Sequence, residues 1–261
     1  MKKILAVLIS LIFVGSTFGI ASVLGKTGGP DAFGYTYDDT VPYQWIDISG
    51  TGKNTGLDMD DGGITVPIGF NFNYYGTNYN EVYISTNGLL KFSGATISWS
   101  NKDIPLASDP NNIICVFWDD LRPPDGDIYY QSFSDKFIVQ WNDIPHISDN
   151  SLPPSRSSLT FQIILYRNSN AIKFQYKEMK NDNCYFADGR SATIGIENIH
   201  GTDGLKYFYG DVYGCTETPA GPIKDGLAIG FKYPGRKAPW ETGQLPMAQI
   251  LKILKANKDK E

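Results

Sequence analysis

The chain has 261 residues, of which 41% are hydrophobic and 13% aromatic, and its formal net charge is -5. This length can bury a sizeable core in one large domain. The acidic balance, without a basic stripe among the aromatic residues, argues against a nucleic-acid-binding protein.

Residues 1–21 have the pattern of a secretory signal peptide. Two lysines precede the apolar run Ile4–Val14, small residues follow it, and cleavage is expected after Gly19 or Ala21. The alternative is an uncleaved anchor, but the run is shorter than the roughly 20 residues of a spanning helix. We therefore expect a secreted protein without a transmembrane anchor after signal removal.

Residues 22–42 are predicted to form an extended arm, because they are rich in Gly and aromatic residues without helical periodicity. Tyr43–Ile48 alternates well enough to predict a first strand. Ile64–Phe72 alternates strictly, and Pro67 within it predicts an edge strand or a local break.

Glu81–Phe92 is predicted to form a central hairpin that turns at Asn87-Gly88, because both residues tolerate positive φ. A two-residue turn pairs Ser85 with Leu90 and Tyr83 with Phe92. Both faces of this hairpin carry apolar residues, which predicts a layered β protein.

Ile113–Trp118 lacks alternation, which predicts a central strand covered on both faces. Further strands are predicted in pairs and singly beyond it. These are Asp127–Phe133, Lys136–Trp141, Leu159–Tyr166, Ala171–Tyr176, Ser191–Glu197, Lys206–Tyr209 and Gly226–Lys232. The pattern indicates an all-β, antiparallel β-sandwich over residues 43–235.

Residues 236–261 are predicted to form a linker and a short C-terminal amphipathic helix over Met247–Asn257. Both the arm and this helix could dock onto a second copy of the chain. The alternative is that both tails fold back onto their own domain.

Three cysteines are present. Cys115, within an apolar run, is predicted to be a buried free thiol. Cys184 and Cys215 lie in loops that flank a predicted strand pair, where a disulfide is geometrically reasonable. Free thiols and a metal site are the competing interpretations.

Two acidic clusters are candidate Ca²⁺ ligands: Asp58, Asp60 and Asp61 in one loop, and Asp119 and Asp120 after the central strand. The alternative for each is a solvated turn. No phosphate loop, Cys-x-x-Cys pair or haem motif occurs, so we expect no cofactor other than a possible Ca²⁺.

Catalytic residues are not predicted. Only His146 and His200 could serve a Ser-His-acid set, and neither lies in a recognisable motif. Asp119 and Asp120 are neighbours that point to opposite faces of an extended strand, so they make a poor glycosidase dyad.

Loop aromatics could stack on sugar rings, and the candidates are Tyr74, Tyr75, Tyr79 and Trp99. Trp118 and Trp141, on apolar strands, are expected in the core.

Several strands together resemble the NIDO extracellular domain of nidogen, tectorin and mucin-like proteins, also found in secreted prokaryotic multidomain proteins. The matching stretches are Val82–Phe92, Ile113–Asp120, Asp127–Tyr130, Phe137–Trp141, Leu159–Tyr166, Ile172–Tyr176 and Ala192–Glu197. The resemblance implies a non-catalytic adhesive or scaffolding module whose partner is an extracellular protein or a glycan. A lectin-like protein is the alternative, and a secreted hydrolase is a more distant one.

Overall fold

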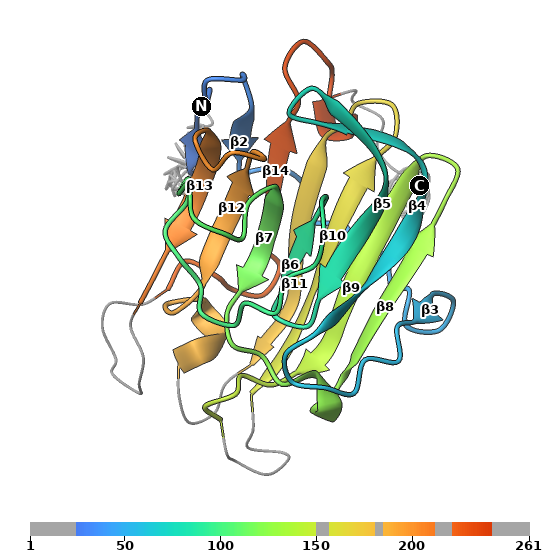
Figure 1. Cartoon of the computed structure of the whole chain (residues 1–261), viewed down its shortest axis with the longest axis vertical. Helices are drawn as coiled ribbons and strands as arrows, with labels where there is room; N and C mark the ends of the chain where they lie inside the picture. The colour runs from blue at the N-terminus through green and yellow to red at the C-terminus, as the bar shows by residue number, and fades with distance from the viewer. Residues whose placement is uncertain (1–24, 150–156, 181–184, 212–220, 242–261) are drawn as a thin grey trace, which may run out of the picture.

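Two antiparallel sheets pack face to face in the computed structural model, which describes residues 25–149, 157–180, 185–211 and 221–241 (Figure 1). The larger sheet contains, in spatial order, β1 (Thr27–Gly28), β2 (Thr36–Asp38), β14 (Ala228–Lys232), β11 (Ile172–Lys180), β10 (Ser158–Tyr166), β9 (Lys136–Ile144), β8 (Asp127–Ser132) and β3 (Lys53–Asn54). The smaller contains β13 (Gly204–Tyr209), β12 (Thr193–Glu197), β7 (Ile113–Trp118), β6 (Leu89–Lys91), β5 (Thr77–Ser85) and β4 (Gly63–Tyr74). The all-β sandwich prediction is confirmed.

Three short 3-10 helices, η1 (Pro123–Asp125), η2 (Tyr185–Asp188) and η3 (Pro239–Glu241), complete the described elements. The predicted signal peptide, both loop cysteines and the predicted helix Met247–Asn257 lie outside the described residues.

The core lies between the two sheets and is lined by alternate residues of their strands. In β4 the inward positions Val66, Ile68, Phe70 and Phe72 are buried, and the strand forms an edge of its sheet as Pro67 predicts. β7 is buried along its whole length between β12 and β6, as a central strand should be. The hairpins β8–β9 and β10–β11 are also confirmed.

The central hairpin has a different register from the one expected. Ile84 pairs with Leu90 and Tyr83 with Lys91, so the loop between β5 and β6 has three residues. Only Gly88 in this loop adopts positive φ (70°), whereas the expected two-residue turn needs Asn87 to do so as well. The shift of one residue turns Ile84 and Leu90 to the same face, and both join the main core.

Residues 25–42 do not form a free arm, which corrects the expectation of an extended one. β1 pairs with β2, and β2 pairs with β14 in the larger sheet. Tyr35 and Tyr37 are buried within the core cluster. This segment therefore folds back onto its own domain, which was the alternative.

The predicted strand at Tyr43–Ile48 is wrong, because this segment pairs with no strand among the residues that the structure describes. Its main chain is instead bound by glutamine side chains on the outer face of the larger sheet. Gln175, Gln162 and Gln140, which are paired in register across β11, β10 and β9, hydrogen-bond with Gln44, Ile46 and Ile48 respectively. The alternating pattern of Tyr43–Ile48 thus reflects hydrogen bonds to side chains of three successive strands, and not main-chain pairing with one neighbouring strand.

Candidate functional site

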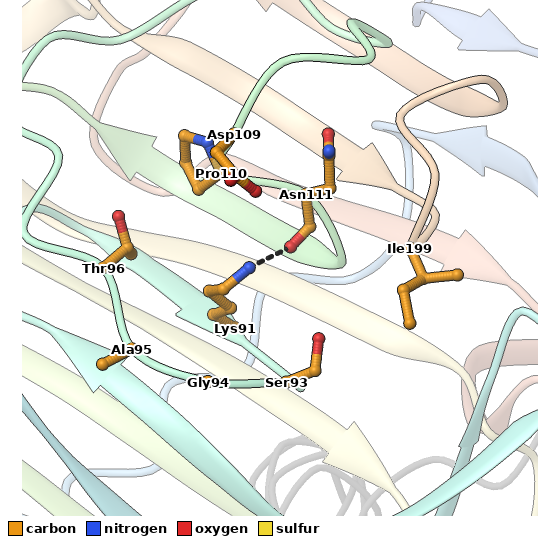
Figure 2. A pocket seen from close by; sticks show the side chains of 9 residues that line it. All are labelled: Lys91, Ser93, Gly94, Ala95, Thr96, Asp109, Pro110, Asn111 and Ile199. Carbon is orange, nitrogen blue, oxygen red and sulfur yellow. Dashed lines mark hydrogen bonds between the residues drawn. The ribbon is translucent and has the colours of Figure 1, made fainter.

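A polar pocket of about 400 Å³ opens between two parts of the long connection from β6 to β7 (Figure 2). Residues 93–96 form one wall and residues 109–111 the other, and Ile199 from the loop after β12 completes the rim. Lys91, the last residue of β6, lies between these walls in Figure 2.

Lys91 is a charged residue in an otherwise apolar strand end, and the residue is only 8% exposed. Its ammonium donates a hydrogen bond to the carbonyl oxygen of Asn111 at 2.7 Å. Burial lowers the pKa of Lys91, while the negative charges of Asp109 and Glu197 act in the opposite direction. The pocket therefore holds a cation that is poorly solvated and close to two carboxyl groups.

Glu197, the last residue of β12, is buried behind the second wall and fixes its shape. Its carboxylate accepts a hydrogen bond from the Leu106 N–H at 2.7 Å. The Asn111 amide, with its nitrogen turned toward Glu197, donates to the same carboxylate at 2.8 Å and to the Leu106 carbonyl at 2.9 Å. Burial raises the pKa of Glu197 to about 7, against the hydrogen bond from Leu106 and the charge of Lys91.

Glu197 is itself held by a buried tyrosine. The Tyr74 hydroxyl accepts from the Glu197 N–H at 3.0 Å and lies within donating distance of two carbonyl oxygens, those of Ile113 and Glu197. These contacts join β4, β7 and β12 directly beneath the pocket wall. The wall is therefore anchored to three strands of the smaller sheet.

A sequence model of the family described as NIDO related matches residues 34–217, which is more than half of the chain. The chain belongs to the NIDO-related family. Comparison with the curated proteins and with the solved structures gave no significant match. The resemblance that the strand sequences suggested is thereby confirmed.

The NIDO-related domain brings the two predicted acidic clusters toward each other. Burial and the nearby charges of Asp60 and Asp61 raise the pKa of Asp120 to about 6. Asn87 connects the two loops, because its amide donates to Asp61 at 2.8 Å and its oxygen accepts from the Leu121 N–H at 3.0 Å.

These carboxylates do not form a ligand set in the described part of the chain. There, no group of three or more His, Cys, Asp or Glu residues is placed to hold a metal ion. Asp58 is exposed on the loop surface, whereas Asp119 is fully buried and directed elsewhere. The Ca²⁺ site therefore stays a prediction.

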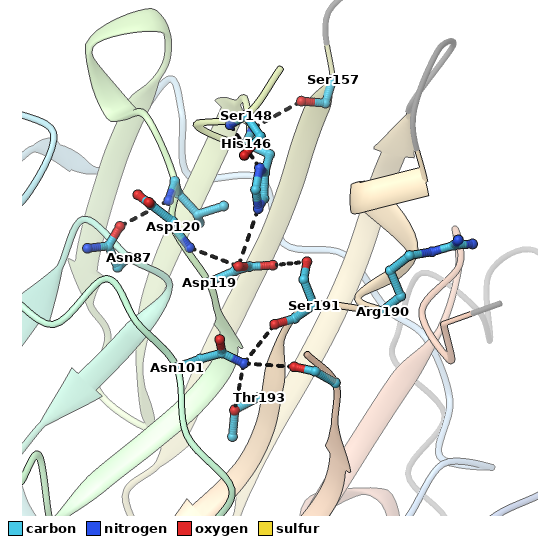
Figure 3. A network of polar contacts seen from close by, with 12 residues as sticks. Asn87, Asn101, Asp119, Asp120, His146, Ser148, Ser157, Arg190, Ser191 and Thr193 are labelled. Carbon is cyan, nitrogen blue, oxygen red and sulfur yellow. Dashed lines mark hydrogen bonds and ion pairs between the residues drawn. The ribbon is translucent and has the colours of Figure 1, made fainter. Parts of the chain in front are cut away.

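Asp119 is the centre of a buried polar network in this domain (Figure 3). Its two oxygens contact His146 Nε2 at 3.3 Å and the Ser191 hydroxyl at 2.5 Å. His146 Nδ1 accepts a hydrogen bond from the Ser148 N–H at 3.0 Å, which leaves Nε2 facing Asp119.

This network contains the three residue types of a catalytic triad in a different order. A triad needs the histidine between the serine and the acid, so that it can take the serine proton. Here the acid lies between Ser191 and His146, and all three residues are fully buried. His200, the other histidine, lies in an exposed loop. The geometry is therefore not that of a Ser-His-acid triad.

The four aromatic residues predicted to stack on sugars lie in different environments. Tyr74 is fully buried, and the Tyr75 hydroxyl donates to Asp31 at 2.7 Å. Tyr79 stacks on Phe92. Trp99 is 51% exposed, so among the four it has the most accessible ring. Trp118 and Trp141 are buried in the core as predicted.

Sequence reasoning missed the pocket residues Lys91, Asp109 and Asn111, because loops bring them together. One sequence feature could have indicated the site: Lys91 is a charged residue in a predicted hairpin whose two faces are otherwise apolar. Cys115 is a buried free thiol, as predicted. Among the residues that the structure describes, no helix is long and apolar enough to cross a membrane.

Proposed function

We propose that this NIDO-related domain is a non-catalytic binding module that acts outside the cell in adhesion or surface scaffolding. NIDO-related domains are typical of extracellular proteins. The observation that carries the proposal is the position of its exposed apolar side chains. Ile97, Trp99, Leu106 and Ile199, each more than 40% exposed, lie on the same connections that form the pocket.

Large apolar side chains that are exposed on two adjoining connections favour a contact surface over a solvated one. Gly201 brings the two connections together, because its Cα packs against the Leu106 carbonyl and the Asn111 side chain. A Cβ built there would lie 2.3 Å from the Leu106 oxygen. The loop that carries Ile199 therefore lies directly against the part of the β6–β7 connection that carries Leu106.

The hydrogen bonds of the buried Ser191 and Glu197 side chains support a non-catalytic role. Ser191 donates a hydrogen bond to Asp119 rather than to His146, so the arrangement differs from that of a Ser-His-acid triad. The carboxylate of Glu197 is occupied by groups that shape the pocket wall.

Adhesion can be tested with beads that carry the purified exported chain. Their retention under flow is measured on surfaces coated with the same chain, with extracellular matrix proteins and with cell-surface glycans. The double variant I97S/W99S is compared with M59S, which removes an exposed apolar side chain from a different loop. We expect wild type and M59S to be retained and the double variant to be released.

Background retention of the wild type on every surface would contradict the adhesive role. Equal retention of the wild type and the double variant would contradict the assigned surface. Hydrolysis of simple esters or glycosides that disappears in S191A or H146A would favour the hydrolase alternative.

Carbohydrate binding is a second candidate function, and the composition of the pocket favours it. Lys91, Asp109 and the hydroxyls of Ser93 and Thr96 offer hydrogen-bond donors and acceptors in one concave site. Binding of the chain to a glycan array, lost in D109N, would support this candidate.

A further inference from the structure

We propose that the pocket around Lys91 binds one neutral pyranose unit of a glycan, with Lys91 and Asp109 as the two specificity-determining side chains. The inference rests on the second candidate function and names its site and ligand class.

The donor side of the site is the Lys91 ammonium. It has three N–H groups and uses one on the Asn111 carbonyl oxygen, while the residue is more than nine-tenths buried. Such a buried ammonium gains free energy from any acceptor that enters the pocket, because water solvates it poorly. An oxygen atom of a ligand fits this requirement.

The acceptor side is Asp109, an exposed residue whose carboxylate can only accept hydrogen bonds. Two hydroxyls lie on the opposite wall. Ser93 accepts from the Asn112 amide at 3.1 Å and Thr96 from the Ser98 N–H at 3.2 Å. Each hydroxyl keeps a hydrogen that it can donate to a ligand.

A sugar hydroxyl both donates and accepts, so neighbouring hydroxyls on one ring can satisfy a donor-only and an acceptor-only side chain together. Charged ligands fit less well. A carboxylate or sulfate that approached Lys91 would also meet Asp109, and an ammonium ligand that approached Asp109 would meet Lys91. The opposite charges of Lys91 and Asp109 offset each other, and Glu197 and Lys102 add one acidic and one basic side chain nearby. This balance favours a neutral ligand.

The rim gives the site an apolar side. Ile199 is 46% exposed at the edge of the pocket, and Ala95 and Pro110 lie on the two walls. The C–H face of a pyranose can pack against such a surface while its hydroxyls point inward. The volume of about 400 Å³ lies within the range of small-molecule sites and leaves room for a pyranose ring.

The test is a titration of the ¹⁵N-labelled full chain with methyl glycosides of glucose, galactose, mannose and N-acetylglucosamine, followed by amide NMR. Glycine and sodium sulfate serve as zwitterionic and anionic probes. We expect saturable shifts of the amides of residues 93–96, of Asp109, Asn111 and Asn112, and of Ile199 with at least one glycoside. The Kd should be on the order of 1 mM, as for a small ligand with few contacts.

D109N should weaken binding roughly tenfold or more, because it removes a charged hydrogen-bond acceptor. K91M should do the same, and K53M, which removes an exposed lysine from the other sheet, should leave the Kd unchanged. The native spectrum outside the pocket reports whether K91M folds. D109N alters an exposed side chain and keeps the test decisive if K91M does not fold.

The proposal is overturned if no glycoside shifts these amides, if glycine or sulfate binds there in preference, or if D109N binds as well as wild type. Bead retention of D109N separates this outcome from the proposed adhesive function. If beads that carry D109N are retained but no glycoside binds, the adhesive function is supported and the proposed sugar site is refuted.

Discussion

Gln175 pairs with both main-chain groups of Gln44: its Oε1 accepts from the Gln44 N–H at 2.5 Å and its Nε2 donates to the Gln44 carbonyl at 2.8 Å. A single side-chain amide thus replaces the neighbouring strand that this residue lacks. Gln175 Nε2 also donates to Gln162 at 3.3 Å, which connects the contact to the next strand.

Gln175→Ala should destabilise the protein by about 2 kcal/mol, because it removes both hydrogen bonds and leaves the Gln44 main-chain groups without partners in the chain. Urea unfolding followed by tryptophan fluorescence measures the change. Gln44→Ala is the matched control, since it keeps the main chain, and it should cost less than about 0.5 kcal/mol. Equal effects of the two variants would show that the side-chain pairing contributes little.

Gly88→Ala should be among the most destabilising single substitutions, at about 3 kcal/mol or more. Gly88 adopts φ of 70°, and an added Cβ would lie 2.0 Å from the Phe117 carbonyl oxygen. Gly235 has the same φ with open space around it, so Gly235→Ala should cost only about 1 kcal/mol. The Gly88 variant should lose more unfolding free energy than the Gly235 variant. The difference between the two losses measures the cost of the steric clash with β7, separately from the cost of the positive φ.

Stability should fall as the pH rises from about 4.5 to about 7, because of Glu197. Its pKa is raised from 4.5 to about 7 in the folded state, so the folded protein binds more protons than the unfolded chain in this window. The contribution is fully present below pH 4.5 and lost above pH 7, and it amounts to about 3 kcal/mol at most.

Glu197→Gln should flatten this part of the pH profile, because the amide does not titrate and its oxygen can still accept from Leu106. Unfolding free energies at pH 4.5, 6 and 7.5 measure the slope. Asp120→Asn is the comparison variant. The pKa of Asp120 is raised to about 6, so Asp120 also lowers stability as the pH rises, but over a lower pH window than Glu197. An unchanged slope in Glu197→Gln would contradict the assignment.

Alkylation of the purified chain without reduction should label only Cys115, and only after denaturation. Cys115 is fully buried, and burial raises its pKa well above the ordinary thiol value. Cys184 and Cys215 should be protected by their predicted disulfide. Peptide mass mapping identifies the labelled residues, and labelling of Cys184 or Cys215 in the native chain would refute the pairing.

The elements with strong local patterns could be predicted from the sequence by itself. Three kinds of local pattern each predict a strand: the strict alternation in β4, the unbroken apolar run of β7, and the paired runs of β8–β9 and β10–β11. The all-β class follows from them, and so does the burial of Trp118, Trp141 and Cys115. Short pieces of these same strands carried the family resemblance.

The tertiary structure decided what depends on groups far apart in the chain. The three-residue loop of the central hairpin is held by the loop before β4: Thr86 accepts a hydrogen bond from the Gly62 N–H at 2.9 Å, and Asn87 donates one to Asp61 at 2.8 Å. The segment around Gln44 alternates like a strand, yet its partners are glutamine side chains roughly 90 to 130 residues away. Local sequence specifies backbone preference, but hydrogen-bond partners are fixed only when the sheets are assembled.

The same distinction applies to the candidate site. The lysine in the hairpin was visible in the sequence, but Asp109 and Asn111 reach it only because Glu197 holds their loop against β12. Asp119, His146 and Ser191 were visible as residue types, and the fold alone determined that the acid lies in the middle. Loop positions depend on the long-range contacts that anchor them, and no local pattern encodes those contacts.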